Sequence, residues 1–376
     1  MNNKTLKNKP RVLFIEPVLA HYRRDVFNDI FSSNSFETKI LAGNNYQGIK
    51  IFHIDNSIIQ KFYTIRLLNH TFYYLKRSLS FVRSYKPDVI VCSGIDFHHI
   101  HTILIFLWAK FTKRKFVWWS HGGFGNQGKV GKCLRGYIYR HSDYIIAYSQ
   151  QGYNNLQQLG VNDFKIKNIG NSINYDDYGF NKKNFKEICG NKPFTLLFSG
   201  RLTPAKRIDV LLKALKELKD NSAIEFRCFI VGCGIIEELK KFSAKLNIND
   251  IVEFVGEKYG DEVVPYFKCA DIFVYPSGIG LSILHALSYG LPVITTNNYN
   301  LHFPEVELLK PGVNGDTFID NDHVDLARKI QNWVVKLQYS KEKISNDCIN
   351  SIFEKEYIPA EQAKKIINVL TQLIFK

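Results

Sequence analysis

Short apolar runs separated by stretches with helical spacing are the main pattern in the first half of the chain. The runs are RVLFIEP (11–17), DVIVCSG (88–94), KFVWWSH (115–121) and DYIIAYS (143–149). Runs of this length predict buried strands, and apolar positions every three or four residues predict helices between them. Strands that alternate with helices form a parallel sheet with helices on both faces. The first half therefore predicts an α/β domain.

The segment from Lys61 to Lys86 shows the helical spacing most clearly. Its apolar positions recur every three or four residues, at Ile65, Leu68, Phe72, Leu75, Leu79 and Val82. This spacing predicts one amphipathic helix. The segment also holds six Lys and Arg residues and no acid.

A second series of apolar runs follows a polar stretch. The runs are PFTLLFSG (193–200), IEFRCFIVG (224–232), DIVEFVG (250–256), DIFVYPS (271–277) and LPVITT (291–296), with a predicted helix at Ile208–Leu218. The polar stretch NSINYDDYGFNKKN (171–184) fits a linker. Since 376 residues exceed the ~100–200 of one domain, we predict one α/β domain over 1–175 and a second α/β domain over 185–355.

Composition excludes several classes of protein. A hydrophobic share of 45% and a charged share of 23% are ordinary for globular proteins and unlike disordered or fibrous ones. The longest apolar run, Thr102–Ala109, is shorter than the ~20 residues that span a bilayer, and the first residues do not read as a signal peptide. The seven scattered cysteines lack CxxC spacing, which argues against zinc and is typical of reduced cysteines in a cytosolic protein.

The positive charge is confined to one half of the chain. Residues 1–175 hold 24 Lys and Arg against 9 Asp and Glu, which equals the whole net charge of +15. Nucleic acid, an anionic membrane surface or a phosphorylated substrate would each explain such an excess. No nucleic-acid recognition motif supports the first of these.

Two segments of the second half have the chemistry of an anion site. In FSGRLTPAKR a strand ends at Gly200, Arg201 follows, and Lys206 precedes a helix. Ligands of open α/β sheets bind outside the carboxyl ends of strands, where two cations and a helix N-terminus suit a diphosphate. A solvated turn is the alternative.

In YPSGIGLSILH, Gly278 and Gly280 would let backbone approach a ligand closely before a helix that begins near Leu281. His285 lies in the first turns of that helix, where it is a ligand contact or a core histidine.

Histidines mark two further places. His121 follows a strand directly, with Gly122, Gly123 and Gly125 behind it, which suits a catalytic or sugar-orienting group, or alternatively a structural one. At the HHIH segment (98–101) we predict a helix beside a cleft and no metal site. The GxG of VGCGIIEE (231–238) lacks the third glycine of a dinucleotide-binding motif, so it is poor evidence for a dinucleotide cofactor.

Five segments of the second half resemble the retaining nucleotide-sugar glycosyltransferases of the GT4 family. They are GRLTPAK, IVGCGIIEEL, FVGEKYGDEVVPYFKCADIFVYPS, GLSILHALSYGLPVITT and PEVELLKPGVNGDTF. The resemblance implies the GT-B fold, in which two Rossmann-like α/β domains face each other across a cleft. We also expect a helix over about 358–376 to pack back on the N-terminal domain.

The resemblance also implies roles for individual residues. His121, Arg201 and Lys206 would be catalytic, His121 beside the transferred sugar in the cleft and the two cations on the donor diphosphate. The E-x7-E glutamates of the family fall on Ser277 and His285 here; His285 would bind the ribose, Ser277 would replace its glutamate in part, and Glu305 would compensate. The donor-binding set would be Gly200, Gly232, Glu257, Lys258, Gly278, Gly280, Leu281, Ser282, His285 and Glu305.

We therefore expect a retaining, metal-independent hexosyl- or N-acetylhexosaminyl-transferase with no cofactor, the nucleotide-diphosphate sugar being its substrate. The acceptor would be a glycan or lipid-linked glycan in bacterial surface polysaccharide or glycoconjugate synthesis. We expect a cytoplasmic protein, peripheral on the inner face of the membrane. A non-catalytic GT-B-like nucleotide-sugar-binding protein and a GT-B nucleotide-sugar epimerase are the alternatives. The basic N-terminal domain would dock on anionic lipid, and not on nucleic acid, through Arg66, Lys76, Arg77 and Arg83, extended by Lys110, Lys113, Arg114 and Lys115.

Overall fold

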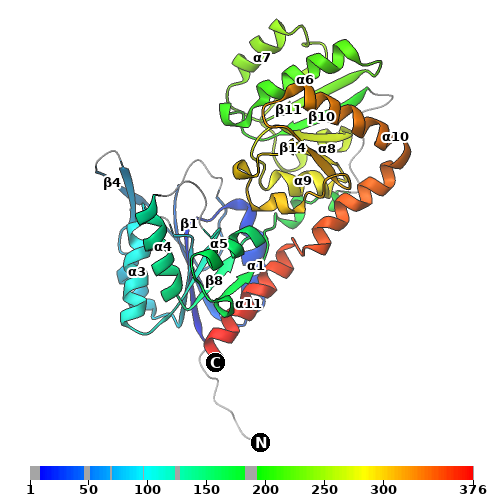
Figure 1. The fold of residues 1–376 in the computed structure, drawn as a ribbon. Coiled ribbons are helices and arrows are strands. Elements are labelled where there is room, and N and C mark those ends of the chain that lie inside the picture. Colours follow the sequence, from blue (N-terminus) through cyan, green and yellow to red (C-terminus); the bar gives the residue numbers. More distant parts are fainter. Residues whose placement is uncertain are drawn as a thin grey trace, which may run out of the picture. The chain divides into compact units, whose positions relative to one another are not determined.

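The computed structural model describes residues 9–45, 51–67, 70–95, 97–122, 128–182 and 193–375. The chain divides into two compact units, which are Met1–Asn174 together with Pro359–Lys376, and Tyr175–Ile358. Both units are α/β, as predicted (Figure 1). The predicted start of the second domain, residue 185, lies outside the described residues.

The first unit holds a seven-stranded parallel sheet with the strand order β3-β2-β1-β6-β7-β8-β9. The strands are β1 (Arg11–Val18), β2 (Glu37–Gly43), β3 (Ser57–Gln60), β6 (Val89–Ser93), β7 (Lys115–Ser120), β8 (Tyr144–Ala147) and β9 (Ile166–Asn168). The four apolar runs predicted as strands are confirmed as β1, β6, β7 and β8. The strands β2, β3 and β9 were not predicted, because ETKILAG, SIIQ and IKN are short or interrupted by polar residues.

Helices cover both faces of this sheet. They are α1 (Arg24–Ser32), α2 (Ser78–Tyr85), α3 (Ile100–Phe111), α4 (Lys129–His141), α5 (Gln150–Gln158) and α11 (Pro359–Phe375). Alternate residues of β1 enter two separate cores, Val12 and Phe14 on one face and Leu13 and Ile15 on the other. The first core includes side chains of α1 and of α11, so the end of the chain packs on the first unit.

The single helix predicted between Lys61 and Lys86 is wrong. The segment forms an antiparallel hairpin of β4 (Phe62–Leu67) and β5 (His70–Leu75), followed by the short helix α2. Ile65 lies opposite Phe72 across the hairpin. Aromatic and β-branched residues favour strands, and cross-strand pairs of this kind stabilise them. The helical spacing therefore continues only from Ser78 onward.

The second unit holds a six-stranded parallel sheet with the order β12-β11-β10-β13-β14-β15. The strands are β10 (Phe194–Ser199), β11 (Phe226–Val231), β12 (Val252–Gly256), β13 (Ile272–Tyr275), β14 (Val293–Thr296) and β15 (Gly315–Phe318), and the helices are α6 (Ile208–Asn221), α7 (Ile236–Lys245), α8 (Val264–Cys269), α9 (Ser282–Ser288) and α10 (His323–Glu354). All five predicted strands are confirmed, as is the predicted helix, which is α6.

Each sheet has one topological switch point, at which the chain reverses the direction in which strands are added. In the first unit this point lies between β1 and β6, and in the second between β10 and β13. The connections on the two sides of such a point lead to opposite faces, which leaves a crevice at the carboxyl ends of the strands. The fold therefore places one candidate ligand site in each unit.

The cysteines differ in their chemical state. Cys92, Cys228 and Cys348 are buried free thiols, whereas Cys269 is disulfide-bonded. The prediction of reduced cysteines throughout is therefore wrong for Cys269.

No helix in the described ranges combines the length and the apolar character that crossing a membrane requires.

Candidate functional site

Lys206 connects the two loops at the switch point of the second unit. It ends the short helix that follows β10, and its ammonium group donates a hydrogen bond to the carbonyl oxygen of Gly278 after β13, with a distance of 2.9 Å. The same ammonium lies 5.0 Å from the ring centre of Tyr275. The side chain is thus fixed where a ligand of this sheet would bind.

Arg201 adds a second positive charge beside Lys206. Burial lowers the pKa of Lys206, and the positive charge of Arg201 lowers it further. The exposed guanidinium of Arg201 also acts on Tyr275 and Tyr259, so it lies in the same group of side chains. Two cations this close repel each other, and a bound anion would remove that repulsion. The arrangement favours a phosphate-bearing ligand.

Glycines bring the loops of this site into contact. A Cβ atom on Gly278 would lie 2.1 Å from the carbonyl oxygen of Leu301, and one on Gly232 would lie 1.9 Å from that of Gly200. Gly232 also has a φ of +145°, which side chains rarely adopt. Its place in the VGCG sequence is therefore explained by close packing of the loops after β10 and β11.

Most of the other residues predicted to bind the donor lie either around Tyr275 or near Arg201. Ser282, next to Leu281 at the start of α9, is hydrogen-bonded to Tyr275, and Gly200 packs against the same tyrosine. Glu257 accepts hydrogen bonds from Cys233 and Tyr259 after β12, close to Arg201, and is followed by the half-buried Lys258. These residues lie together with Arg201 and Lys206.

His285 and Glu305 have neighbours of a different kind. The half-buried His285 lies with its ring 6.3 Å from that of Phe267 on α8. Glu305 is buried at 2% exposure, and its charge contributes to raising the pKa of Tyr357. Ser277 is buried below the glycine turn, and its carbonyl accepts a hydrogen bond from the Thr295 hydroxyl at 3.1 Å. That these residues replace the two family glutamates stays a prediction.

His302 is a residue of this site that the sequence analysis missed. The amide N–H of Ile279, in the middle of the glycine turn, donates to His302 Nδ1 at 3.1 Å. His302 Nε2 lies 2.9 Å from the carbonyl oxygen of Thr296, and the N–H of Phe303 donates back to the Ile279 carbonyl at 2.9 Å. The imidazole therefore holds the glycine turn against the loop after β14. Burial lowers its pKa, so the ring is neutral near pH 7.

Replacing His302 by phenylalanine is expected to destabilise the second unit. The buried amide of Ile279 would lose its acceptor, and an unsatisfied buried donor costs ~1–3 kcal/mol. Thermal unfolding of His302→Phe and His302→Gln measures this, because a glutamine oxygen can still accept the Ile279 N–H. Equal unfolding temperatures for His302→Phe and the wild type would contradict the role of His302.

His121 lies at the carboxyl end of β7 in the first unit. Its ring stacks on Tyr148 with 4.3 Å between ring centres, and the side chain is half-buried. Burial lowers the pKa of His121 to about 4, with a further contribution from Arg23. A neutral imidazole at this edge can donate or accept a hydrogen bond without carrying charge. Gly123 and Gly125 lie outside the described residues.

A buried ion pair beside His121 was not predicted from the sequence. Arg23 Nη1 donates to Glu16 Oε2 at 2.6 Å, and the guanidinium also donates to the Tyr148 hydroxyl. Ser93, at the end of β6, donates to the same Glu16 oxygen at 2.6 Å. Glu16 belongs to β1, so the ion pair lies at the switch point of the first sheet. An acid near the end of a first strand was the available sequence signal.

The described residues contain no group of three or more His, Cys, Asp or Glu side chains arranged to hold a metal ion.

Two compact units that each hold a parallel α/β sheet have the architecture of the GT-B fold. Family models agree with this assignment. Residues 180–350 match the family described as glycosyl transferases group 1, and residues 35–177 match the one described as glycosyltransferase family 4. The two matches follow each other and together cover most of the chain. Both halves of the chain are therefore similar to glycosyltransferases, the second half to group 1 and the first half to family 4.

Named relatives and solved structures show the same likeness. The chain is 26% identical to the protein named WcaL of Escherichia coli, a glycosyltransferase named for colanic acid biosynthesis, over 60% of this chain and 58% of WcaL. It is 31% identical to the amylovoran biosynthesis glycosyltransferase AmsK of Erwinia amylovora, over 36% of this chain and 35% of AmsK. The chain thus spans less than two thirds of these relatives.

In the fold, the chain resembles a glycosyltransferase from Rickettsia africae, with a TM-score of 0.74, 17% identity and coverage of 98% of this chain and 99% of that one. Anabaena HepE, solved with UDP, has a TM-score of 0.69 at 15% identity, covering 96% of this chain and 100% of that one. Likenesses at this identity concern the fold.

Proposed function

We propose that the protein transfers a sugar, with retention of configuration, from a nucleoside-diphosphate sugar to a glycan or lipid-linked glycan in polysaccharide assembly. The observation that carries this proposal is the pair Arg201 and Lys206 at the switch point of the second unit, with Lys206 fixed on the Gly278 carbonyl. The names of WcaL and AmsK support polysaccharide synthesis, and the UDP bound to HepE supports a nucleotide donor.

The proposed reaction breaks the bond between the anomeric carbon and the diphosphate oxygen. An acceptor hydroxyl forms the new bond on the same face of the sugar, and its proton passes to the leaving phosphate oxygen. Arg201 and Lys206 would stabilise the charge that develops on the diphosphate. His121, being neutral, would hold a hydroxyl of the transferred sugar in place. No metal step is proposed.

A thermal-shift panel of UDP-, GDP-, ADP- and CMP-sugars tests this function and identifies the donor. A ligand at 100-fold its dissociation constant adds ~2.7 kcal/mol of stability, which is readily detected. Proton NMR of the product formed from the stabilising donor then gives the anomeric configuration. A product with inverted configuration would contradict retention, and the absence of any stabilising nucleotide sugar would contradict the function.

We further propose that the first unit attaches the protein peripherally to anionic lipid at the inner face of the cytoplasmic membrane. Three apolar side chains on one face of β4 are exposed, Tyr63 at 46%, Ile65 at 54% and Leu67 at 61%. Arg66, Arg77 and Arg83 are exposed on the hairpin, the turn after it and α2. Exposed apolar side chains and exposed cations on the same hairpin and helix match an anionic bilayer surface, to which each such cation contributes ~1 kcal/mol.

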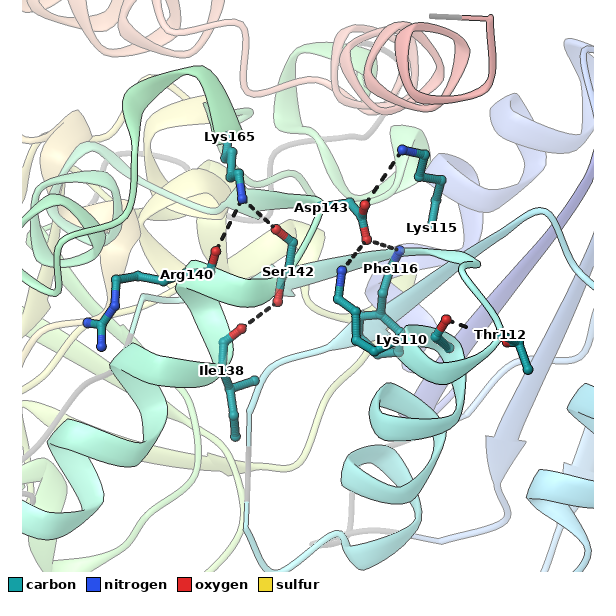
Figure 2. Close-up of polar contacts among 10 residues, drawn as sticks. Lys110, Thr112, Lys115, Phe116, Ile138, Arg140, Ser142, Asp143 and Lys165 are labelled. Carbon is teal, nitrogen blue, oxygen red and sulfur yellow. Dashed lines mark hydrogen bonds and ion pairs between the residues drawn. The ribbon is translucent and has the colours of Figure 1, made fainter.

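Three of the other cations expected on this face form ion pairs elsewhere. Lys110 and Lys115 form ion pairs with Asp143 at 2.8 and 3.7 Å, at the amino ends of β7 and β8 (Figure 2). Arg114 pairs with Asp88 at 3.3 Å near the start of β6. These residues lie at the sheet edge opposite to His121. We therefore assign attachment to the hairpin and α2, which differs from the single basic helix face that the sequence predicted.

Reversing the charge at Arg66, Arg77 and Arg83 together is expected to remove most binding to vesicles that contain anionic lipid. Three engaged cations contribute ~3 kcal/mol, more than a hundredfold in affinity. Co-sedimentation at low salt measures this, with Lys241, Lys245 and Lys343 of the second unit reversed together as the matched control. Equal binding of both triple variants, or equal binding of the wild type to neutral vesicles, would contradict the attachment.

A further inference from the structure

A cavity of about 130 Å³ lies at the switch point of the first sheet. It is lined by the ends of β1 and β6 and the beginning of α3, through Ile15, Glu16, Pro17, Ser93, Gly94, His99, His101 and Thr102. One water occupies ~30 Å³ in the liquid, so the cavity would hold roughly four waters or a large part of one sugar ring. Its position at the carboxyl ends of β1 and β6 is where ligands of such sheets bind.

Glu16 presents one unused carboxylate oxygen in the wall of this cavity. The side chain is 3% exposed, and its Oε2 accepts hydrogen bonds from both Arg23 and Ser93. Its Oε1 is buried and has no hydrogen-bond partner among the described residues. The ion pair with Arg23 already neutralises the charge, so Oε1 requires a neutral hydrogen-bond donor and not a cation.

His101 presents a second acceptor. The side chain is 1% exposed, and its ring is hydrogen-bonded to the backbone of Tyr73. The Tyr73 amide already donates to the His98 carbonyl at 2.6 Å, so the ring N–H of His101 donates to the Tyr73 carbonyl. Burial lowers the pKa of His101 to about 3, and the neutral ring therefore keeps a lone pair on Nδ1. Nδ1 is buried without a partner in the described part of the chain.

The β4-β5 hairpin keeps these imidazoles in place. The ring of Tyr73 stacks on that of His99 at 5.2 Å, and His99 meets His101 edge to face at 5.7 Å. Phe62 contacts both histidines, with 5.5 and 6.0 Å between ring centres. The acceptor on His101 thus belongs to a wall of packed aromatic rings.

We propose that this cavity binds an uncharged sugar through two of its hydroxyl groups, one donating to Glu16 Oε1 and the other to His101 Nδ1. Two buried acceptors that lack a donor among the described residues match a ligand that brings two O–H donors. A carboxylate or phosphate at this place would bring further acceptor oxygens against the carboxylate of Glu16. This inference rests on the proposed function, because the sugar is then the end of the acceptor glycan. It assigns the acceptor a neutral terminal sugar.

Saturation-transfer NMR with methyl glycosides of glucose, galactose and N-acetylglucosamine tests the inference, with glucuronate as the charged comparison. We expect saturation transfer from the protein to at least one neutral glycoside. This NMR signal should fall at least fivefold in His101→Phe, which keeps a ring but removes Nδ1. His98→Phe is the matched control, since His98 is exposed and does not line the cavity. A stronger saturation-transfer signal for glucuronate than for the neutral glycosides would overturn the inference. So would an unchanged signal for the neutral glycoside in His101→Phe.

A second variant keeps the test valid if His101→Phe folds poorly. Thr102→Leu narrows the cavity and leaves both acceptors, so it should also reduce the saturation-transfer signal of the neutral glycoside. An unchanged signal would overturn the inference. Titration of the same samples with a nucleoside diphosphate separates the two claims. If a cavity variant loses glycoside binding but still binds the nucleotide, the loss is specific to this cavity. If the wild type binds no nucleotide, the proposed function is contradicted.

Discussion

Alanine at Arg201 or at Lys206 is expected to weaken the binding of a nucleoside diphosphate at least tenfold, with the fold intact. Hydrogen bonds to charged groups contribute ~1.5–3 kcal/mol each, and ~1.4 kcal/mol corresponds to tenfold in affinity. Lys206 is fixed by the Gly278 carbonyl and loses little freedom when an anion binds. Isothermal titration calorimetry measures the affinity, and circular dichroism checks the fold.

Arg207 offers a matched control for this experiment. It follows Lys206 directly and carries the same charge, but its guanidinium is held by both carboxylate oxygens of Asp209 at 3.0 Å. Arg207→Ala should therefore leave nucleotide affinity within about twofold of the wild type. Lys206→Gln distinguishes charge from the hydrogen bond to Gly278, which a glutamine can still form. Unchanged affinity in both Arg201→Ala and Lys206→Ala would remove the support for the diphosphate site.

The second large effect is expected at His121. His121→Ala should lower the rate of transfer by roughly 10²–10³-fold, the usual cost of removing one donor that acts in the transition state. Nucleotide affinity should stay nearly unchanged, because the proposed diphosphate contacts belong to the second unit. His141→Ala is the control, since His141 is an exposed histidine of α4. A large loss of nucleotide affinity in His121→Ala, with an unchanged rate, would contradict this role.

The pH dependence of the rate gives an independent check on His121. Its pKa is lowered to about 4, so the ring stays neutral as the pH falls from 8 to 6. An ordinary histidine, with a pKa near ~6.5, would become protonated in that range. Protonation of His121 should therefore cause no decline in rate above pH ~5. A decline centred near pH 6.5 that disappears in His121→Asn would contradict a neutral, positioning histidine.

The sequence predicted the sheets well because central parallel strands are continuous apolar runs, as in KFVWWS of β7. It failed at the hairpin, where apolar residues at Ile65 and Phe72 fit helical spacing and cross-strand pairing equally well. Only the non-local pairing of β4 with β5 decides between the two. The edge strand β3, with SIIQ, is too short to stand out from its surroundings.

That Arg201 and Lys206 lie close together could be predicted, because both belong to one loop. Their role at a diphosphate stays a prediction. The site was not predictable where function depends on contacts between distant segments. His302 meets Ile279 across 23 positions, and Ser93 meets Glu16 across 77. The buried acceptor on His101 also depends on the hairpin, whose carbonyl at Tyr73 fixes the tautomer of the ring.

The central claim is that the second unit binds the diphosphate of a nucleotide donor at Arg201 and Lys206. Calorimetric titration with a nucleoside diphosphate and the matching monophosphate, in the wild type and in the Arg201→Ala/Lys206→Ala double variant, tests it most directly. The account predicts at least tenfold tighter binding of the diphosphate by the wild type and near-equal, weak binding of both nucleotides by the double variant. A preference for the diphosphate that persists in the double variant would contradict it.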